Sequence, residues 1–421
     1  MKQVTITIIG AGPAGQTASL FLAKKGIPSH LIDKETHPRL KPCADIVTGK
    51  ALRILNDLDN QLPIDEALTS EYLPIKGTLV HLPKNKTLNI EFLPLKNLEH
   101  LPTCLALPRA NFDNWLYQKV KASPLIELHE NTVITQCKRD EKNKEWIIFN
   151  HEKKAFLRTK LLVIATGSNS SLPFTVGDLK RNDRHYAVGI RAYFRNVEEN
   201  KDFPQHPELF LDKKLFPGGF YIAPFSNGTV NVNIVMRSDI LKKKKINLNK
   251  LFYQFIAENP ILKKRFNKAE QIGNLQGCAL HLGTQSRPIS GDGYLLAGDA
   301  AGLIDLISAN GIPQAMISGK LAAEQIAIAL QKNDFSAAVL KAYDRKVYKL
   351  IQNDLQLGRI LSPFLGYAIF SKLLFYSLGF LANRQGLQMQ IQKLLYTRNV
   401  IKTLINPMFY WRIITSSAPP Q

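Results

Sequence analysis

Two glycine-rich segments, far apart in the chain, constrain its fold more than any other feature. In the first, a β-branched strand pattern at Val4–Ile9 leads into Gly10, Gly12 and Gly15 at the start of an apolar helix. A second short strand follows and ends in Asp33. This order of strand, glycine turn, helix, strand and acid is the pattern of a dinucleotide-binding unit. We expect the helix N-terminus to face a pyrophosphate and Asp33 to accept hydrogen bonds from ribose hydroxyls.

The second segment, Gly291–Gly302, contains Gly298 and Asp299 and implies that the chain returns to the same nucleotide. A nucleotide fold closed by two distant parts of a long chain is typical of FAD enzymes and unusual for simple NAD dehydrogenases. We expect Asp299 to accept from a ribityl hydroxyl, while Gly298 and Gly302 keep side chains away from the ligand. A helix that opens near Ile312 would direct its positive end toward the flavin ring. FAD is therefore the predicted cofactor.

Five segments, in the same order along the chain, resemble the geranylgeranyl reductase family of FAD-dependent oxidoreductases. This family lies within the flavoproteins shaped like para-hydroxybenzoate hydroxylase. The resembling segments are Gly10–Gly15, Pro38–Asp45, Leu107–Leu116, Gly189–Phe194 and Gly298–Ala323, and the resemblance extends from Lys2 to about Tyr343. It implies an α/β fold with a Rossmann-like FAD-binding domain of the GR2 type, an antiparallel-sheet substrate domain and a C-terminal helical region.

The motifs and the resemblance together nominate a set of contact residues. Those expected at FAD are Gly10, Gly12, Pro13, Ala14, Gly15, Asp33, Lys34, Arg39, Lys41, Cys43, Ala44, Arg109, Val133, Ala165, Thr166, Gly167, Gly298, Asp299, Gly302, Gly311 and Ile312. Those expected at the substrate are Tyr193, Phe220, Tyr221 and Pro224. The alternative for Arg109 is a surface salt bridge.

Cys43 has two interpretations. Beside the flavin it would shape the site or donate a proton to a substrate that is being reduced, which makes it the candidate catalytic residue. As a free thiol it would instead be a small buried apolar group. The four cysteines lack Cys-x-x-Cys spacing, so neither a metal site nor a disulfide framework is predicted.

The chain departs from the family pattern at points that bear on donor and substrate. Thr166 replaces the aspartate of an Asp-Gly pair, and no second complete glycine motif offers a nicotinamide site. NAD(P)H is therefore expected to bind transiently, or another donor reduces the flavin. In Gly219–Pro224, only Tyr221 and Pro224 persist from the reductases' substrate motif, so an isoprenoid substrate does not follow from the sequence.

The order of motifs predicts a discontinuous domain organisation. The FAD-binding domain is expected at 1–75, 100–175 and 276–345, the substrate domain at 76–99 and 176–275, and a C-terminal helical, membrane-associated region at 346–421. In the substrate domain, short strands with Pro and Gly breaks predict one antiparallel sheet that covers the flavin.

The charge distribution separates the C-terminal region from the rest. Net charge is +21, yet the last acidic residue is Asp354, and the tail beyond it combines seven Lys and Arg with an almost wholly apolar run at Ile360–Leu381. Basic and aromatic residues suit the surface of an anionic membrane, and the alternative is a helical pair that packs on the protein. No motif supports nucleic acid. The N-terminus and the cysteines favour a cytoplasmic protein, peripheral on the inner face of the membrane, and the oligomeric state stays open.

Two chemistries follow for an FAD enzyme with a hydrophobic, lipid-like substrate. The first is reduction of carbon–carbon double bonds, as in geranylgeranyl reductase-like enzymes. The second is a flavin-dependent monooxygenase acting on an aromatic or polyene substrate; a halogenase ranks below a hydroxylase because the Trp-x-Trp-x-Ile-Pro signature is absent. A third reading is a non-catalytic, flavin-binding, membrane-associated protein.

Overall fold

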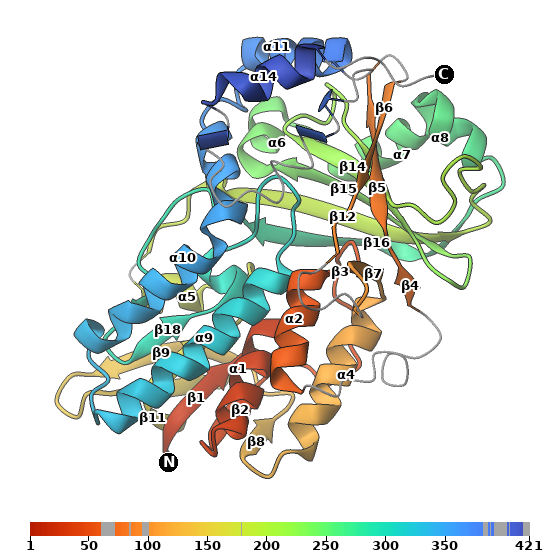
Figure 1. The fold of residues 1–421 in the computed structure, drawn as a ribbon. Coiled ribbons are helices and arrows are strands. Elements are labelled where there is room, and N and C mark those ends of the chain that lie inside the picture. The colour runs from red at the N-terminus through yellow and green to blue at the C-terminus, as the bar shows by residue number, and fades with distance from the viewer. Residues whose placement is uncertain are drawn as a thin grey trace.

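The computed structural model describes residues 1–59, 72–83, 86–94, 101–177, 179–381, 386–387, 389–390, 402–403 and 405–415. Two large sheets organise this part of the chain, with the helices of the first sheet at one end of the molecule and the second sheet above them (Figure 1). The C-terminal helices run from the first body to the far side of the second.

The first sheet carries the nucleotide-binding pattern. Its main path is β17 (Ser290–Gly291), β18 (Tyr294–Leu296), β11 (Ala155–Ile164), β1 (Lys2–Ile9), β2 (Ser29–Ile32) and β8 (Ile126–His129), and β10 (Glu145–Asn150) and β9 (Ile134–Asp140) extend from β11. The strands from β18 to β8 are parallel. Because β18 lies beside β11, the second glycine segment is brought back to the first.

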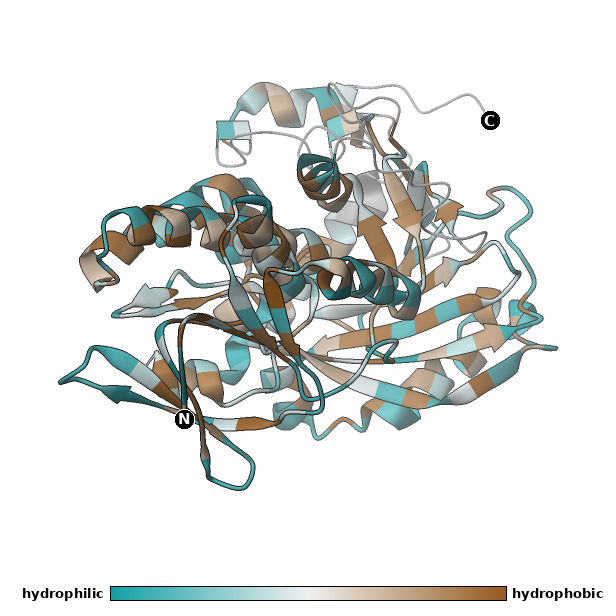
Figure 2. Ribbon diagram, turned by 90° about the horizontal axis from the view of Figure 1, so that it is seen from below, coloured by the Kyte–Doolittle hydropathy of each residue, from teal (hydrophilic) through white to brown (hydrophobic). Residues whose placement is uncertain are grey.

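Helices cover this sheet. They are α1 (Pro13–Lys24), α2 (Gly49–Leu58), α4 (Arg109–Ala122), the short α5 (Leu172–Val176), α9 (Ile312–Gln331) and α10 (Ala337–Leu361). Helix α1 packs closely on α9, where a Cβ on Gly319 would lie 2.4 Å from the Ala14 carbonyl oxygen. Brown and teal bands alternate along the helices in Figure 2, as expected where one face is buried and the other is solvated.

The second sheet has seven strands. Their order is β16 (Glu270–His281), β12 (Tyr186–Arg195), β15 (Val230–Arg237), β14 (Gly218–Pro224), β13 (Glu208–Phe210), β5 (Gly77–Leu82) and β6 (Lys86–Glu91). One face packs its apolar side chains against α7 (Leu248–Glu258) and α8 (Pro260–Arg265), and α6 (Ser238–Lys244) follows β15. The predicted antiparallel sheet is confirmed, and within it one pair of strands, β13 and β5, is parallel.

A small third sheet, β3 (Ile46–Thr48), β7 (Cys104–Ala106) and β4 (Leu73–Pro74), lies between the two larger ones. The domain boundary expected at residue 276 is wrong, because β16 continues to His281 within the seven-stranded sheet. The rest of the three-segment division stays a prediction, and the strand pairing supports it.

The C-terminal region begins with a helix that belongs to the core. Along α10, buried residues recur at helical spacing and face α9 (Leu340, Tyr343, Val347, Ile351 and Leu355). Beyond it, α11 (Ala368–Leu381) and α14 (Pro407–Thr415) lie beside the seven-stranded sheet (Figure 1). Within the described part of the chain, none of the helices combines the length and the apolar character that crossing a bilayer requires.

Candidate functional site

The turn between β1 and α1 contains two glycines that are closely surrounded by protein atoms and one that faces open space. Gly10 has a φ of +106°, and a Cβ there would lie 2.4 Å from the Ala165 carbonyl oxygen. A Cβ on Gly15 would lie 1.8 Å from the Gly10 carbonyl oxygen, so both positions exclude a side chain. At Gly12, the nearest atom to an added Cβ is Arg39 Nη2 at 3.9 Å. The space at the N-terminus of α1 is therefore open to a phosphate group.

Asp33 stabilises this turn through hydrogen bonds to the backbone. It is buried, and its carboxylate accepts hydrogen bonds from the Ala11 N–H at 2.5 Å and the Glu35 N–H at 3.0 Å. Arg39 Nη2 lies 3.6 Å from Asp33 Oδ2. Each carboxylate oxygen keeps a lone pair beyond these bonds, which a ribose hydroxyl could use.

Two residues nominated for the cofactor lie at the surface near Asp33. The Lys34 ammonium pairs with Glu35 at 3.2 Å, and Val133 is exposed next to Thr132, whose N–H donates to the Asp33 carbonyl. Their contact with the cofactor stays a prediction.

The segment after β11 offers a polar atom that has no protein partner. Thr166 Oγ1 is buried without a hydrogen-bond partner among the described residues. Gly167 has a φ of +77°, and nothing lies within 4 Å of a Cβ built there. An orphaned hydroxyl beside open space fits a bound ligand better than a closed protein core.

The second glycine segment places Asp299 beside the residues that follow β11. Ser168 Oγ donates to Asp299 Oδ2 at 3.4 Å, and the Asp299 side chain lies beside Gly311, which begins α9. The contact of Gly298 and Gly302 with the cofactor stays a prediction, and the structure gives both glycines a further role. A Cβ on Gly298 would lie 3.0 Å from Ala14 Cβ, and one on Gly302 would lie 2.8 Å from His281 Nε2. Both glycines have positive φ and serve close packing within the protein.

Asp45 connects the seven-stranded sheet to the start of α4, one of the helices of the first sheet. Its carboxylate is fully buried and accepts from the Tyr193 hydroxyl at 2.6 Å, from Asn231 Nδ2 at 2.6 Å and from the Arg109 N–H at 3.2 Å. Asn231 Nδ2 also donates to the Cys43 carbonyl at 2.8 Å. Burial raises the pKa of Asp45 to about 6, although the Tyr193 hydrogen bond and the nearby guanidinium groups of Arg191 and Arg109 act in the opposite direction.

Neither Asp45 nor Asn231 was predicted as a site residue from the sequence. The available signal for Asp45 was an acidic residue directly after the Cys-Ala pair that is expected at the flavin, in a segment otherwise rich in basic residues. Asn231 carried no signal of its own beyond the alternation of β15.

Arg109 is held in a buried ion pair, so the surface salt bridge considered for it is wrong. Its guanidinium contacts both oxygens of Asp113 at 2.7 Å, and the two side chains are 5% and 0% exposed. Burial acts to lower the pKa of Arg109, but the charge of Asp113 and the hydrogen bond with Cys43 leave it above its ordinary value. Arg109 therefore stays cationic beside the half-buried Cys43, for which a catalytic role stays a prediction.

The four residues nominated for the substrate divide between the two faces of the seven-stranded sheet. Tyr193 faces the nucleotide-binding body through Asp45, and Tyr221 occupies the same face two strands away, since both lie opposite asparagines of β15. The prediction for Phe220 is wrong, because alternation places it on the other face, where it is fully buried against Phe252 and Phe255. The fourth nominated residue, Pro224, is the last residue of β14.

A separate cluster lies on the pair β2–β8. His30, Glu127 and His129 bring their ligand atoms within 4.8 Å of one another. Burial lowers the pKa of both histidines, and the Lys2 ammonium already contacts Glu127 at 2.5 Å. Lys2 supplies the positive charge that a metal ion would bring, and the expected absence of a metal stays a prediction.

Comparison with known proteins assigns the class of the protein. The family model described as FAD binding domain matches residues 3–356, and the chain belongs to this family. It is an FAD-dependent oxidoreductase, which confirms the predicted cofactor and reaction class.

The relatives carry different activities. A 1H-pyrrole-2-carbonyl-[peptidyl-carrier protein] brominase of Pseudoalteromonas luteoviolacea is 29% identical over 79% of this chain and 80% of its own. A digeranylgeranylglycerophospholipid reductase of Thermoplasma volcanium is 26% identical over 82% of this chain and 84% of its own.

Solved structures confirm the fold. A geranylgeranyl bacteriochlorophyll reductase-like protein from Thermoplasma acidophilum superposes with a TM-score of 0.75 at 19% identity, covering 98% of this chain and 96% of its own. A flavin-dependent brominase gives a TM-score of 0.72 at 24% identity, covering 94% and 93%.

Proposed function

We propose that the protein uses FAD to reduce carbon–carbon double bonds of a hydrophobic, lipid-derived substrate. The observation that carries this proposal is the buried Asp45–Tyr193 hydrogen bond at the junction of the two sheets. Reduction of a double bond needs a hydride on one carbon and a proton on the other, and this pair is a buried proton-active group at the end of the segment Pro38–Asp45, which is expected beside the flavin.

The residues of the cofactor site suit FAD. Gly12 and the N-terminus of α1 would hold the pyrophosphate, Asp33 the ribose, and Asp299 and Thr166 the ribityl and flavin side. When bound, FAD supplies hydride transfer. NAD(P)H is proposed as a transient donor.

The chain's own contribution is to hold and deliver a proton. With a pKa of about 6, Asp45 takes up a proton as the pH falls toward that value. When Oδ2 is protonated, its hydrogen bond with Tyr193 reverses, and the tyrosine hydroxyl hydrogen is free to point toward a substrate carbon. Tyr193 is thus the proposed donor and Asp45 its source. The alternative donor is the Cys43 thiol.

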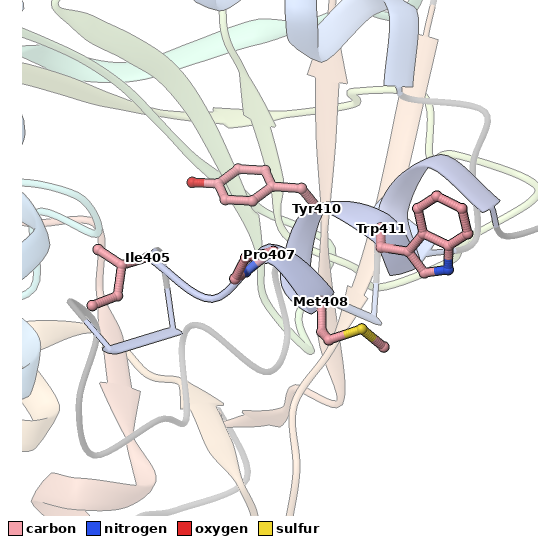
Figure 3. A pocket seen from close by; sticks show the side chains of 5 residues that line it. All are labelled: Ile405, Pro407, Met408, Tyr410 and Trp411. Atoms are coloured by element: carbon pink, nitrogen blue, oxygen red, sulfur yellow. The ribbon is translucent and has the colours of Figure 1, made fainter.

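Peripheral membrane association is part of the proposal, supported by apolar side chains on the C-terminal helices. Ile369 and Tyr376 on α11 are 83% and 74% exposed, and Trp411 on α14 is 61% exposed. Figure 3 shows Ile405, Pro407, Met408, Tyr410 and Trp411 lining a shallow apolar depression at α14. Surrounded by a basic, acid-free tail, such side chains suit an anionic lipid surface and would bring the enzyme to its substrate.

Product mass tests the proposed reaction. Dithionite-reduced holoenzyme is incubated without oxygen with a geranylgeranyl lipid in detergent micelles. A gain of two hydrogens per double bond supports the reductase, and Tyr193→Phe should lose most of this rate, whereas Tyr253→Phe, which alters an exposed tyrosine of α7, should keep it.

A flavin-dependent monooxygenase or halogenase is the second candidate, because the brominase above is among the most similar relatives. In air with NADH or NADPH, it would add one oxygen, or one halogen when halide is present, to an aromatic or polyene substrate. A product of that mass, together with no oxygen-independent reduction, would reject the reductase.

A further inference from the structure

A polar row crosses the face of the seven-stranded sheet that looks toward the nucleotide-binding body. Strand register places Tyr221 of β14 opposite Asn233 of β15, Asn233 opposite Arg191 of β12, and Arg191 opposite Gln276 of β16. Residues directly opposite one another in an antiparallel pair share a face of the sheet. Tyr193, two residues after Arg191, shares that face and contacts Asp45 of the other body. The row therefore lines the junction in which the reaction is proposed to occur.

Arg191 is the unusual member of this row. Its residue is only 4% exposed, and its guanidinium carbon lies 4.1 Å from the centre of the Tyr193 ring. Nε is buried without a hydrogen-bond partner, and the guanidinium forms no salt bridge with any residue that the structure describes. A buried cation without a counter-charge is costly, so arginines in such places are normally paired.

The buried carboxylate of Asp45 lies close enough to interact with the charge of Arg191, but the two side chains form no salt bridge in the described structure. The oxygens of Asp45 already accept from Tyr193, Asn231 and the backbone of Arg109. Asp113, the other buried acid of this region, is engaged at both oxygens by Arg109. None of the residues that the structure describes supplies an oxygen to Arg191 Nε.

Gln276 presents a second unsatisfied atom beside Arg191. Its Oε1 is buried without a partner in the described structure. Lys41, Asp299 and Arg191 all lie close enough to influence the pKa of the Cys278 thiol on β16, so these charged groups belong to the same region of the molecule.

We infer that Arg191 binds an anionic oxygen of the substrate, of the carboxylate class, at the end of an otherwise apolar molecule. The planar guanidinium matches a planar carboxylate and would lose its unpaired charge on binding. Gln276 Oε1 then accepts from a donor on the same ligand or from a water beside it. This inference rests on the proposed function only in taking the junction as the substrate site.

Binding to the FAD-loaded protein tests the inference without turnover. The probes are geranate and its neutral isostere geranamide, titrated by isothermal calorimetry and by the change in flavin absorbance. Geranate should bind at least about tenfold more tightly than geranamide, the increment expected of one charge-assisted hydrogen bond. Arg191→Gln should remove this preference and leave geranamide binding unchanged.

Two further variants keep the result interpretable. Arg191→Lys retains the charge without the planar fork and should restore part of the preference. Arg195→Gln, on the same strand but exposed and paired with Glu270, should bind both probes as the unaltered protein does.

Three outcomes would overturn the inference. Equal affinity of the unaltered protein for geranate and geranamide would remove the anion requirement, and tighter binding of geranyl phosphate than of geranate would change its chemical class. Loss of FAD from a folded Arg191→Gln protein would instead make Arg191 a cofactor residue. Since no chemical step is measured, failure of the reductase assignment would leave a positive binding result standing.

Discussion

Tyr193→Phe offers a quantitative test of the junction between the two sheets. The substitution removes one hydroxyl, which donates to the buried Asp45 carboxylate at 2.6 Å. A hydrogen bond to a charged group contributes about 1.5–3 kcal/mol. Since one pKa unit corresponds to about 1.36 kcal/mol, the pKa of Asp45 should rise from about 6 to between about 7 and 8.

The sign of the effect on stability follows from linkage. The folded-state pKa of Asp45 lies above its ordinary value of 3.8, so its contribution to the free energy of unfolding is fully present below that value and is lost as pH rises through about 6. In the variant, this loss continues through about pH 7–8. Tyr193→Phe should therefore destabilise the protein more at pH 8 than at pH 5, by about 1–2 kcal/mol.

Urea unfolding of the FAD-loaded proteins at the two pH values measures this difference. Tyr253→Phe is the matched control, because the Tyr253 hydroxyl bonds Gln271 at the surface, and it should change stability by less than about 0.5 kcal/mol at both pH values. Equal destabilisation by Tyr193→Phe at pH 5 and pH 8 would refute the assignment of Asp45 as the titrating partner.

Three other predictions concern the cofactor and the tail. Gly15→Ala should prevent folding, because its Cβ would lie 1.8 Å from a carbonyl oxygen, whereas Gly12→Ala should fold and lose FAD affinity. Circular dichroism measures folding and flavin fluorescence measures FAD binding. Equal behaviour of the two variants would contradict the open position at Gly12. Asp299→Ala should weaken FAD retention by about 1.5–3 kcal/mol in a dialysis assay, and undiminished retention would remove Asp299 from the site. Flotation of the unaltered protein with anionic vesicles should decrease as the salt concentration rises. Ile369→Ser combined with Tyr376→Ser should abolish this flotation while FAD stays bound. Flotation equal to that of the unaltered chain would reject the proposed membrane surface.

Point substitutions are a better test of the C-terminal tail than truncation. Helix α14 packs Phe409 and Ile413 against the apolar side chains of β5 and β6. Truncation after Gly358 would uncover that surface and confuse folding with membrane binding. Point substitutions of exposed side chains avoid this difficulty.

Local sequence predicted the nucleotide-binding part of the fold well, because its determinants lie close together in the chain. The strand before Gly10 and the helix after it are specified within about one βαβ unit. The approach of Asp299 to the same turn was also predictable, because its segment has a recognisable pattern. The packing of His281 against Gly302 could not be predicted, because local sequence does not show which side chain lies against a glycine.

The polar junction was not predictable in the same way. The Asp45 bonds to Tyr193 and Asn231 join positions that are 148 and 186 residues apart. Which of Phe220 and Tyr221 faces the junction depends on strand register, and a shift of one residue exchanges the two faces. Single-sequence patterns do not fix that register.

Ser168 connects Asp299 to the seven-stranded sheet through two hydrogen bonds. Its hydroxyl donates to Asp299 and at the same time accepts from the His281 N–H at the end of β16. A ligand that repositions Asp299 must also shift the balance of the bond that anchors this strand. We therefore expect the free energy of FAD binding and the free energy of local opening of β16 to be coupled. By thermodynamic linkage, FAD binding changes the opening free energy by the same amount as opening changes the binding free energy.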